Sequence, residues 1–371
     1  MRVVFTAGGT GGHINPALAA AGELKRRHPD AQILFIGAKD RMEATLVPNA
    51  GFELKTVKIS GFYRKISIKN LFRNVQTVYH IATSSAQVRK ILKEFNPDVV
   101  VGFGGYASGP AVRTAAKMGI KTAIHEQNAF PGVTNKTLAK YVDTVMLTNE
   151  AAKKYLKCKN EPTVTGLPVR NEILGADRAF ARTELHLNDD DIMILSMGGS
   201  QGAKIINRNI AGMITNLWQN KNLVFLHATG EYGKEWMPQM LRDNGVEIGD
   251  NVRIVEYINN MEVALPAADI VISRAGASSL SEIEALGKAS ILIPSPNVAE
   301  NHQYHNAMAL VNNKAAKIIE EKDLTPEKLT VEVKELIDNS EKRFLLGENA
   351  LKMAMPESKK IICDIIEKLA D

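Results

Sequence analysis

Two glycine-rich turns constrain the fold of this chain more than any other feature of its sequence. The first is Gly8-Gly9-Thr10-Gly11-Gly12-His13, and the second, 190 positions later, is Gly198-Gly199-Ser200-Gln201-Gly202-Ala203. A short apolar run precedes each turn and a segment with helical spacing follows it, so each predicts a strand, a turn and a helix in succession. Glycine lets a backbone pass close to a ligand, and the free amides of a helix N-terminus attract phosphate. The two turns therefore predict two half-sites of the kind that binds nucleotides.

A second pair of segments matches in the same order. Asp98–Ser108 aligns with Asp269–Ser279 without a gap, and both contain an aspartate, three β-branched residues, a glycine and a serine. Duplication of a half-domain explains the match, and so does convergence, because parallel-sheet domains commonly place a glycine turn after an apolar strand. Both explanations predict the same architecture in the two halves.

Chain length and the alternation of segment types predict two domains. A chain of 371 residues exceeds what one hydrophobic core usually organises. Apolar runs alternate with helix-period segments in both halves, which is typical of doubly wound parallel sheets. The predicted strands are Arg2–Thr6, Gln32–Ile36, Asp98–Gly102, Lys121–His125 and Asp143–Thr148 in the first half, and Ile192–Ser196, Leu223–His227, Arg253–Glu256, Asp269–Ser273 and Ser290–Ile293 in the second.

Proline and glycine interrupt this pattern between the halves. Two prolines and a glycine lie within Glu161–Arg170, a composition typical of a linker. We therefore expect an α/β fold of two Rossmann-like domains that face each other across a cleft. The expected domains are residues 1–165 and 171–371, joined by a linker at 166–170, with the last helix a candidate for return to the first domain. Ligands of such sheets bind at the carboxyl ends of the strands, where both glycine turns lie.

Export and membrane insertion are not expected. The chain begins directly on a predicted strand, without a charged and apolar leader. Its two cysteines, Cys158 and Cys363, belong to no recognisable motif, and no apolar run approaches the roughly 20 residues that span a bilayer. We expect a protein of the reducing cytoplasm whose contact with a membrane is peripheral.

Metal and nicotinamide sites are not expected either. Asp189-Asp190-Asp191 matches a metal-binding pattern of sugar transferases, but it precedes its strand and so lies at the sheet edge opposite the glycine turns. His125-Glu126 lacks a second histidine four positions on, and His302 and His305 have no third ligand nearby. The dinucleotide fingerprint fails because Ile14 stands where its third small residue is needed. The sequence therefore indicates no metal and no cofactor.

Motifs along nearly the whole chain occur in the order found in one enzyme family. They are Gly8–Pro16, Asp40–Glu43, Gly104–Pro110, His125–Asn128, Thr134–Lys136, Gly166–Arg170, Gly198–Ala203, Arg274–Gly276, Ser281-Glu282 and Gln303. In these motifs the chain resembles the peptidoglycan N-acetylglucosaminyltransferases of glycosyltransferase family 28, which have the GT-B fold and convert lipid I to lipid II. One departure is Asn259-Asn260, where the family often has acidic residues. It concerns only side chains beside Ile258, whose backbone the resemblance implies as a contact of the donor uracil, so that contact stands.

The resemblance implies transfer of N-acetylglucosamine from UDP-N-acetylglucosamine, the donor, to undecaprenyl-pyrophosphoryl-N-acetylmuramyl-pentapeptide (lipid I), the acceptor, with inversion at the anomeric carbon. It implies a donor site in the second domain and an acceptor site in the first. Ser200 is implied to meet the donor phosphate, Ile258 the uracil and Glu282 the ribose. The full implied set for substrate binding is Thr10, Gly11, Gly12, Asn128, Arg170, Ser200, Ile258, Ala277, Ser278, Ser279, Leu280, Ser281, Glu282 and Gln303, with Gly104, Gly105, Tyr106 and Asn135 at the acceptor.

The chemistry requires a stabiliser of the leaving group and a base. Without a metal, the charge of the departing diphosphate must be met by backbone amides, a helix N-terminus and Arg170. The acceptor hydroxyl must lose a proton, and His13 is the candidate catalytic base, because a helix N-terminus keeps an imidazole neutral. Two alternatives stay open. In the first, His13 only hydrogen-bonds the turn or an acceptor phosphate. In the second, Glu126 acts as the base.

Glu282 and Gln303 each have a structural alternative. Ser279-x-x-Glu282 fits a capping box, in which the carboxylate closes the start of a helix instead of binding ribose. Gln303 lies in a stretch with helical spacing, where a solvated surface amide is the alternative to a contact with the donor sugar, a contact also implied for Asn128.

Three other functions share parts of this pattern. A non-hydrolysing epimerase of UDP-N-acetylglucosamine would have the same fold and donor but no membrane-facing acceptor surface. A glycosyltransferase with a diacylglycerol acceptor would differ only in its acceptor pocket. A non-catalytic partner subunit would be expected to lack one half-site or the base, whereas this chain has both turns and His13.

A basic and apolar segment predicts docking on the cytoplasmic face of an anionic membrane. Residues 54–93 contain no carboxylate and nine lysines and arginines, in a chain of net charge +5. Basic side chains near anionic lipid contribute about 1 kcal/mol each, enough for reversible adsorption. The candidate membrane residues are Phe62, Arg64, Lys65, Ile68, Lys69, Leu71, Phe72 and Arg73.

Two alternatives apply to this segment. The apolar positions fit core packing, and the basic ones fit a solvated face or a nucleic-acid patch. No recognition motif accompanies the charge, so we expect no nucleic-acid partner. The resemblance adds proteins of cell-wall synthesis and division as candidate partners.

Overall fold

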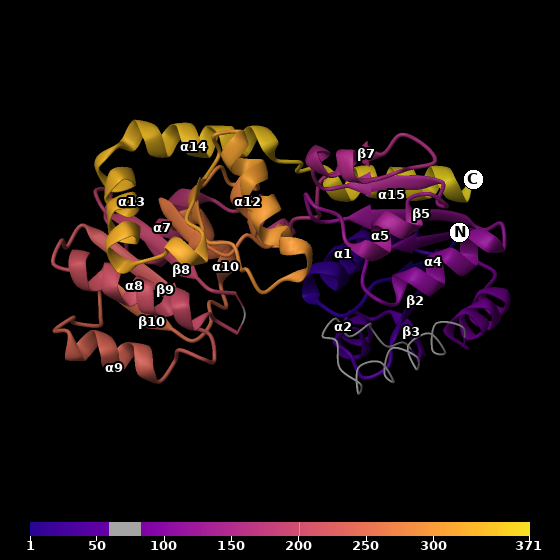
Figure 1. Cartoon of the computed structure of the whole chain (residues 1–371), viewed down its shortest axis with the longest axis horizontal. Coiled ribbons are helices and arrows are strands. Elements are labelled where there is room, and N and C mark those ends of the chain that lie inside the picture. Colours follow the sequence, from indigo (N-terminus) through magenta and orange to yellow (C-terminus); the bar gives the residue numbers. More distant parts are fainter. Residues whose placement is uncertain (59–82, 200) are drawn as a thin grey trace. The chain divides into compact units, whose positions relative to one another are not determined.

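The computed structural model describes residues 1–58, 83–199 and 201–371, which form two compact units. Unit 1 comprises Met1–Pro168 together with Glu357–Asp371, and unit 2 comprises Val169–Pro356. Each unit is built around one parallel sheet with helices packed on it (Figure 1). The expected α/β class with two doubly wound sheets is confirmed.

The sheet of unit 1 has the strand order β3-β2-β1-β4-β5-β6-β7, the doubly wound order with one strand added at an edge. Its strands are β1 (Arg2–Thr6), β2 (Gln32–Ala38), β3 (Glu53–Val57), β4 (Val99–Gly102), β5 (Lys121–Glu126), β6 (Thr144–Leu147) and β7 (Thr163–Val164). Its helices include α1 (Gly11–Arg27), α2 (Glu43–Asn49), α4 (Ser108–Lys117), α5 (Val133–Leu138), the 3-10 helix η1 (Glu150–Tyr155) and α15 (Ser358–Ala370).

The sheet of unit 2 has the same doubly wound order without the added edge strand, β10-β9-β8-β11-β12-β13. Its strands are β8 (Ile192–Met197), β9 (Leu223–Ala228), β10 (Val252–Val255), β11 (Ile270–Ser273), β12 (Ala289–Leu292) and β13 (Lys317–Ile318). Its helices are α6 (Asn171–Leu174), α7 (Arg178–Glu184), α8 (Lys204–Leu217), α9 (Trp236–Asp243), α10 (Met261–Ala267), α11 (Ala277–Ala285), α12 (His302–Asn312), α13 (Pro326–Asp338) and α14 (Ser340–Met353), with 3-10 helices η2 (Ala299–Asn301) and η3 (Glu321–Asp323).

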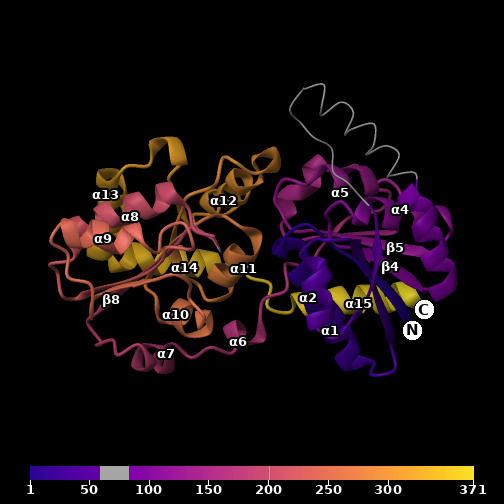
Figure 2. The ribbon, with the colours of Figure 1, turned by 90° about the horizontal axis from the view of Figure 1, so that it is seen from below.

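Both surfaces of each sheet are buried, which explains why the strands are continuous apolar runs rather than alternating ones. In β1, Val3 and Phe5 pack in the core that contains α1 and α15, while Val4 packs in the opposite core with α4. In unit 2, α8 and α13 cover one side of β8 and α10 covers the other (Figure 2). The glycine turns therefore emerge at the carboxyl edge of a sheet covered on both sides.

The last helix, α15, packs in unit 1 although the elements before it belong to unit 2. Helix α15 lies beside α1 (Figure 2). Ile362, Cys363 and Ile366 of α15 are fully buried in the core that they share with α1. Arg27, at the end of α1, adds ion pairs to Asp364 at 2.6 Å and to Glu367 at 3.2 Å. Burial of these three side chains and the partly buried ion pairs of Arg27 together hold α15 on unit 1.

We predict that Ile366→Ala selectively destabilises unit 1. Removing a fully buried isoleucine side chain costs about 2–5 kcal/mol of unfolding free energy. Both tryptophans, Trp218 and Trp236, lie in unit 2. Thermal unfolding followed by circular dichroism should therefore show an earlier transition, while tryptophan fluorescence keeps the parental midpoint. The exposed Lys360→Ala variant is the control on the same helix, and equal shifts in both signals for Ile366→Ala would contradict the assignment of α15 to unit 1.

Candidate active site

The first glycine turn joins β1 to α1 in unit 1. Thr10 is the N-cap residue of α1, with extended backbone angles and no side-chain capping bond, and Gly11 and Gly12 begin the helix. The Nδ1 atom of His13 lies 3.2 Å from the carbonyl oxygen of Gly8 and 3.2 Å from the hydroxyl of Thr10. A carbonyl oxygen only accepts, so we assign the ring hydrogen to Nδ1. In the neutral ring, Nε2 is then the atom that accepts a proton.

The loop after β4 closes on this turn. A Cβ atom on Gly105 would lie 2.1 Å from the carbonyl oxygen of Gly8, and one on Gly104 would lie 2.8 Å from Cδ2 of His13. Both glycines have positive φ angles, +92° for Gly104 and +82° for Gly105, so other residues would be strained as well as crowded there. The adjoining Tyr106 is exposed. The structure therefore brings Gly104 next to His13 and Gly105 against the first glycine turn.

Glu126 is a buried carboxylate that organises the loop after β5. Its Oε1 accepts from the backbone N–H and the Nδ2 of Asn128, at 2.9 and 3.2 Å. Its Oε2 accepts from the N–H of Gly132 at 3.1 Å and from Nδ2 of Asn135 at 2.9 Å. Burial raises the pKa of Glu126, and these hydrogen bonds to the carboxylate act in the opposite direction. The alternative base Glu126 and the implied residues Asn128 and Asn135 thus form one cluster, in which both oxygens of Glu126 are already used as acceptors.

His125 is held as a neutral structural group. Its Nε2 lies 2.9 Å from the carbonyl oxygen of Gly166, and its Nδ1 lies 3.1 Å from Nε2 of Gln127. The ring stacks on Phe103 with centroids 5.2 Å apart. Burial lowers the pKa of His125 to about 4, so the ring is uncharged near neutral pH. His125 therefore ties the sheet edge to the segment at the end of unit 1.

The second glycine turn joins β8 to α8 in unit 2. Ser200, implied to meet the donor phosphate, lies outside the described residues. A Cβ atom on Gly202 would lie 1.9 Å from the carbonyl oxygen of Thr229, and one on Gly230 would lie 2.1 Å from the nitrogen of Gly202. The turn is locked against the loop after β9, much as the first turn is locked against the loop after β4.

A buried hydrogen-bond network supports that loop. Nδ1 of His227 lies 2.8 Å from the hydroxyl of Ser196, and Nε2 lies 3.2 Å from Oδ1 of Asn207. Asn207 in turn donates through Nδ2 to the carbonyl of Thr229 at 2.8 Å. Burial lowers the pKa of His227 to about 3. No sequence pattern singles out His227 in β9 or Asn207 in α8, because a polar residue within an apolar strand or helix gives no signal of its partners.

Four residues implied to bind the donor meet at one cavity of unit 2, with a volume of about 220 Å³. Arg170 precedes α6, Ile258 follows β10, and Ser279 and Glu282 lie on α11. Gly199 of the second glycine turn also lines the cavity, which therefore opens at the carboxyl edge of the sheet. The other lining residues are Met197, Ala228, Tyr257, Asn259, Met261, Leu265 and Ile283.

An ion pair crosses this cavity. Nε of Arg170 donates to Oε1 of Glu282 at 2.9 Å. The side chain of Arg170 is 51% exposed and that of Glu282 is 17% exposed, so the carboxylate is the more desolvated partner. The other carboxylate oxygen makes no hydrogen bond to the part of the chain that the structure describes. The site can therefore present one cation and one acceptor oxygen to a ligand.

Helix α11 begins earlier than the capping-box interpretation requires. Its N-cap residue is Gly276, without a side-chain capping bond, and Ser279 is the third residue of the helix. The capping-box interpretation of Glu282 is therefore wrong. Within the described structure, the cavity lining does not include the remaining residues of the implied series, which are Ala277, Ser278, Leu280 and Ser281.

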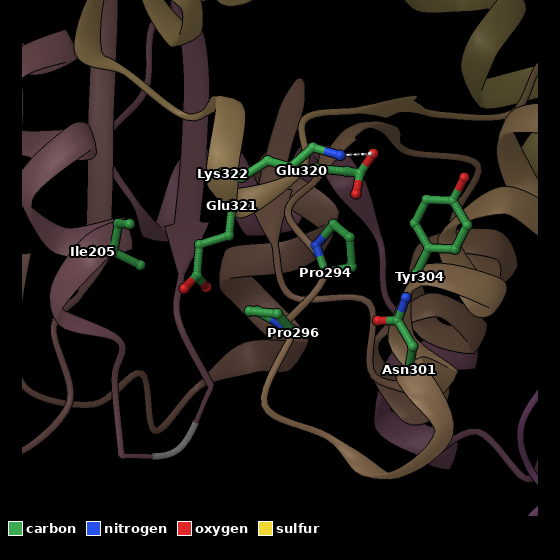
Figure 3. Close-up of a pocket in the computed structure, with 8 residues that line it drawn as sticks. All are labelled: Ile205, Pro294, Pro296, Asn301, Tyr304, Glu320, Glu321 and Lys322. Carbon is green, nitrogen blue, oxygen red and sulfur yellow. Dashed lines mark hydrogen bonds and ion pairs between the residues drawn. The ribbon is translucent and has the colours of Figure 1, made fainter.

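Gln303 lies on α12, outside this cavity. Its Oε1 accepts from the backbone N–H of Ser295 at 2.9 Å, so it is not a solvated surface amide. The two prolines beside Ser295, Pro294 and Pro296, line a second cavity of about 350 Å³. Tyr304 and the Glu320–Lys322 segment line it as well (Figure 3). The remaining lining residues are Ile205 and Asn301. Gln303 therefore fixes the loop after β12.

Two predictions remain, one about metal binding and one about the membrane segment. Among the residues that the structure describes, no three or more His, Cys, Asp or Glu side chains are grouped to hold a metal ion. The candidate membrane residues lie outside the described residues, namely Phe62, Arg64, Lys65, Ile68, Lys69, Leu71, Phe72 and Arg73.

Both units match known proteins. The glycosyltransferase family 28 N-terminal domain matches residues 3–147, and the C-terminal domain of the same family matches residues 193–363. The UDP-N-acetylglucosamine--N-acetylmuramyl-(pentapeptide) pyrophosphoryl-undecaprenol N-acetylglucosamine transferase of Desulforamulus reducens is 44% identical over 371 residues, covering 100% of this chain and 99% of that protein.

Solved structures agree with this at the level of the fold. The crystal structure of Acinetobacter baumannii MurG has a TM-score of 0.82 and 28% identity, over 99% of both chains. The UDP-GlcNAc 2-epimerase of Neisseria meningitidis, bound to UDP-GlcNAc, has a TM-score of 0.63 at 14% identity, over 99% of this chain and 100% of that one. The second likeness concerns the fold alone.

We predict that unit 2 loses stability in mild acid through His227. The folded ring stays neutral down to about pH 3, whereas an unfolded histidine takes up a proton below about pH 6.5. Unfolding free energy is therefore retained above pH 6.5 and lost as pH falls from 6.5 toward 3, by about 2 kcal/mol at pH 5. Urea titrations followed by tryptophan fluorescence at pH 7 and pH 5 measure this loss.

His227→Gln, which cannot titrate, should be less stable at pH 7 but lose less stability between the two pH values. The exposed His186→Asn variant is the matched control in the same unit. Equal losses in the parent and in His227→Gln would contradict the assignment.

Proposed function

The chain belongs to glycosyltransferase family 28, and we propose that it transfers N-acetylglucosamine from UDP-N-acetylglucosamine to lipid I, giving lipid II. The observation that carries this proposal is the cavity where Arg170, Ile258, Ser279 and Glu282 meet the second glycine turn. It lies in a chain 44% identical, along its whole length, to a transferase named for this reaction. The activity is that of an inverting hexosyltransferase.

Unit 2 supplies the donor site in this proposal. The uracil lies against the backbone at Ile258, and the ribose hydroxyls donate to Glu282. The described geometry supports this assignment, because both residues line one cavity and a carboxylate oxygen of Glu282 remains to accept. Ser200 and the amides of the turn receive the diphosphate at the start of α8, where free N–H groups favour an anion.

Arg170 has two tasks in the proposed cycle. It holds Glu282 in place through the 2.9 Å hydrogen bond, and its guanidinium adds positive charge beside the second turn. Charge builds on the diphosphate as its bond to the sugar breaks, and fixed donors around it lower the barrier. Gln303 acts on the same site indirectly, by holding the loop after β12 through Ser295.

Unit 1 supplies the acceptor site and the base. The acceptor hydroxyl attacks the anomeric carbon from the side opposite UDP, a C–O bond forms, and the bond to the UDP oxygen breaks with its electron pair. The hydroxyl proton passes to Nε2 of His13, whose Nδ1–H points to Gly8. We assign Glu126 to positioning rather than to proton transfer, because both of its oxygens already accept hydrogen bonds from Asn128, Gly132 and Asn135.

The acceptor also sets the location proposed for the protein, the cytoplasmic face of the cell membrane. No helix among the described residues is long and apolar enough to cross a bilayer. We propose peripheral docking through the basic and apolar segment around residues 62–73, which brings the first glycine turn to the lipid-linked pyrophosphate. Partners in cell-wall synthesis and division fit the same surface location.

We predict that His13→Ala lowers kcat by about 100-fold, because it removes a general base. Steady-state transfer to a short-chain lipid I analogue measures the effect. His28→Ala, at the exposed end of the same helix, is the matched control. A variant that keeps near-parental kcat but loses affinity for the acceptor would assign His13 to binding instead.

We predict that Glu282→Gln weakens binding of UDP by about 1–3 kcal/mol, since a charge-assisted hydrogen bond in a partly desolvated cavity is lost. Isothermal titration with UDP provides the measurement, with the exposed Glu327→Gln as control. Unchanged UDP affinity together with a lower melting temperature would show that Glu282 serves only the structure of unit 2.

We predict that the protein co-sediments with vesicles containing anionic phospholipid and not with neutral ones. Replacing Arg64, Lys65, Lys69 and Arg73 with glutamine should release it, because each basic side chain contributes about 1 kcal/mol near an anionic surface. Binding that ignores both the lipid charge and these four substitutions would place the docking surface elsewhere.

A further inference from the structure

We propose that Glu43 is a positioning residue, which fixes the tautomer and orientation of His13 through the peptide group between Gly8 and Gly9. The inference deepens the proposed function and rests on it for the identity of the reaction. Glu43 is the first residue of α2, and its side chain is 1% exposed.

Two glycines make the space that this side chain occupies. A Cβ atom on Gly8, after β1, would lie 2.5 Å from Oε1 of Glu43. A Cβ atom on Gly37, within β2, would lie 2.7 Å from its Cγ. Neither position tolerates a larger residue while Glu43 stays in place. The carboxylate is therefore built into the sheet edge directly behind the first glycine turn.

Both carboxylate oxygens of Glu43 accept backbone hydrogen bonds. Oε2 accepts from the N–H of Gly9 at 3.1 Å, and Oε1 accepts from the N–H of Ala38 at 3.0 Å. Two backbone donors need two acceptor atoms, which a carboxylate offers and a carboxamide does not. The turn and the end of β2 are therefore joined by this one side chain.

The N–H of Gly9 and the carbonyl of Gly8 belong to the same planar peptide group and point in opposite directions across it. Glu43 holds the N–H, so the carbonyl is directed toward Nδ1 of His13 at 3.2 Å. Gly9 has a φ angle of +87°, and glycine on both sides of a peptide leaves it free to rotate. Without the carboxylate, rotation of this peptide would remove the carbonyl that accepts from Nδ1. The hydroxyl of Thr10, 3.2 Å from Nδ1, can donate as well as accept and so does not fix the tautomer.

Glu43→Gln tests this directly. This substitution retains the size and shape of the side chain, but it places an N–H donor opposite the backbone N–H of Gly9 or of Ala38. We expect kcat to fall by about 10- to 100-fold, the scale of a misplaced reacting group, with an unchanged KM for UDP-N-acetylglucosamine, which is bound by unit 2. Glu53→Gln, the same chemical change at an exposed glutamate of unit 1, should behave as the parent.

Two further readouts separate positioning from mere stability. Nitrogen-15 NMR of labelled histidine should show His13 as the Nδ1–H tautomer in the parent and a mixture of tautomers in Glu43→Gln. In a His13→Ala background, Glu43→Gln should reduce kcat by less than about 3-fold, because residues acting as a unit are not additive. An unchanged tautomer, or the same loss in both backgrounds, would overturn the proposal.

If Glu43→Gln does not fold, Gly8→Ala replaces it, since its methyl group displaces the carboxylate while leaving Glu43 in the chain. The same change of tautomer is expected, and a parental spectrum would overturn the proposal. The NMR readout requires no turnover. A parent protein that shows the Nδ1–H tautomer but does not act on lipid I would contradict the proposed function and leave the role of Glu43 standing.

Discussion

Each half-site depends on a contact between two backbones that leaves no room for a Cβ atom. In unit 1 the carbonyl of Gly8 fills the position that a side chain on Gly105 would need, and in unit 2 the carbonyl of Thr229 does the same to Gly202. These contacts lock each glycine turn to the loop of a neighbouring strand at the carboxyl edge of the sheet. A locked turn presents its amides in one direction, which is the requirement for binding a diphosphate without reorganisation.

Buried polar side chains hold these turns and loops in place through hydrogen bonds, while the groups assigned to chemistry are not fully buried. Glu43 and Glu126 each spend both carboxylate oxygens on hydrogen bonds that hold loops in place. His227, kept neutral by burial, does the same for the second turn through Asn207. Such groups are costly to bury unless every partner is present. Their hydrogen bonds hold the backbone of these loops in place.

The sequence predicts the fold well where strands are apolar and turns contain glycine. β1 is predicted to the residue, and alternation of the two segment types predicts the doubly wound class of both sheets. The sequence pattern does not predict the edge strands β3, β7 and β13, because they are short or polar. Sequence motifs identify the cavity residues Arg170, Ile258 and Glu282. They do not identify His227 or the role proposed for Glu43, because both depend on contacts between segments that are far apart in the chain. The capping-box interpretation fails because the helix starts at Ala277, where Gly276 caps it without a side chain.

The proposed reaction joins a sugar to a lipid-linked acceptor, whereas an epimerase of the same fold would only isomerise the sugar nucleotide. The direct measurement is incubation with radiolabelled UDP-N-acetylglucosamine and a short-chain lipid I analogue, followed by mass spectrometry and NMR of the products. A transferase should release one equivalent of UDP for each β-linked disaccharide lipid formed, with no label transferred when the acceptor is omitted. Conversion of the donor to its 2-epimer without a disaccharide product, or an α-linked product, would contradict the proposed reaction.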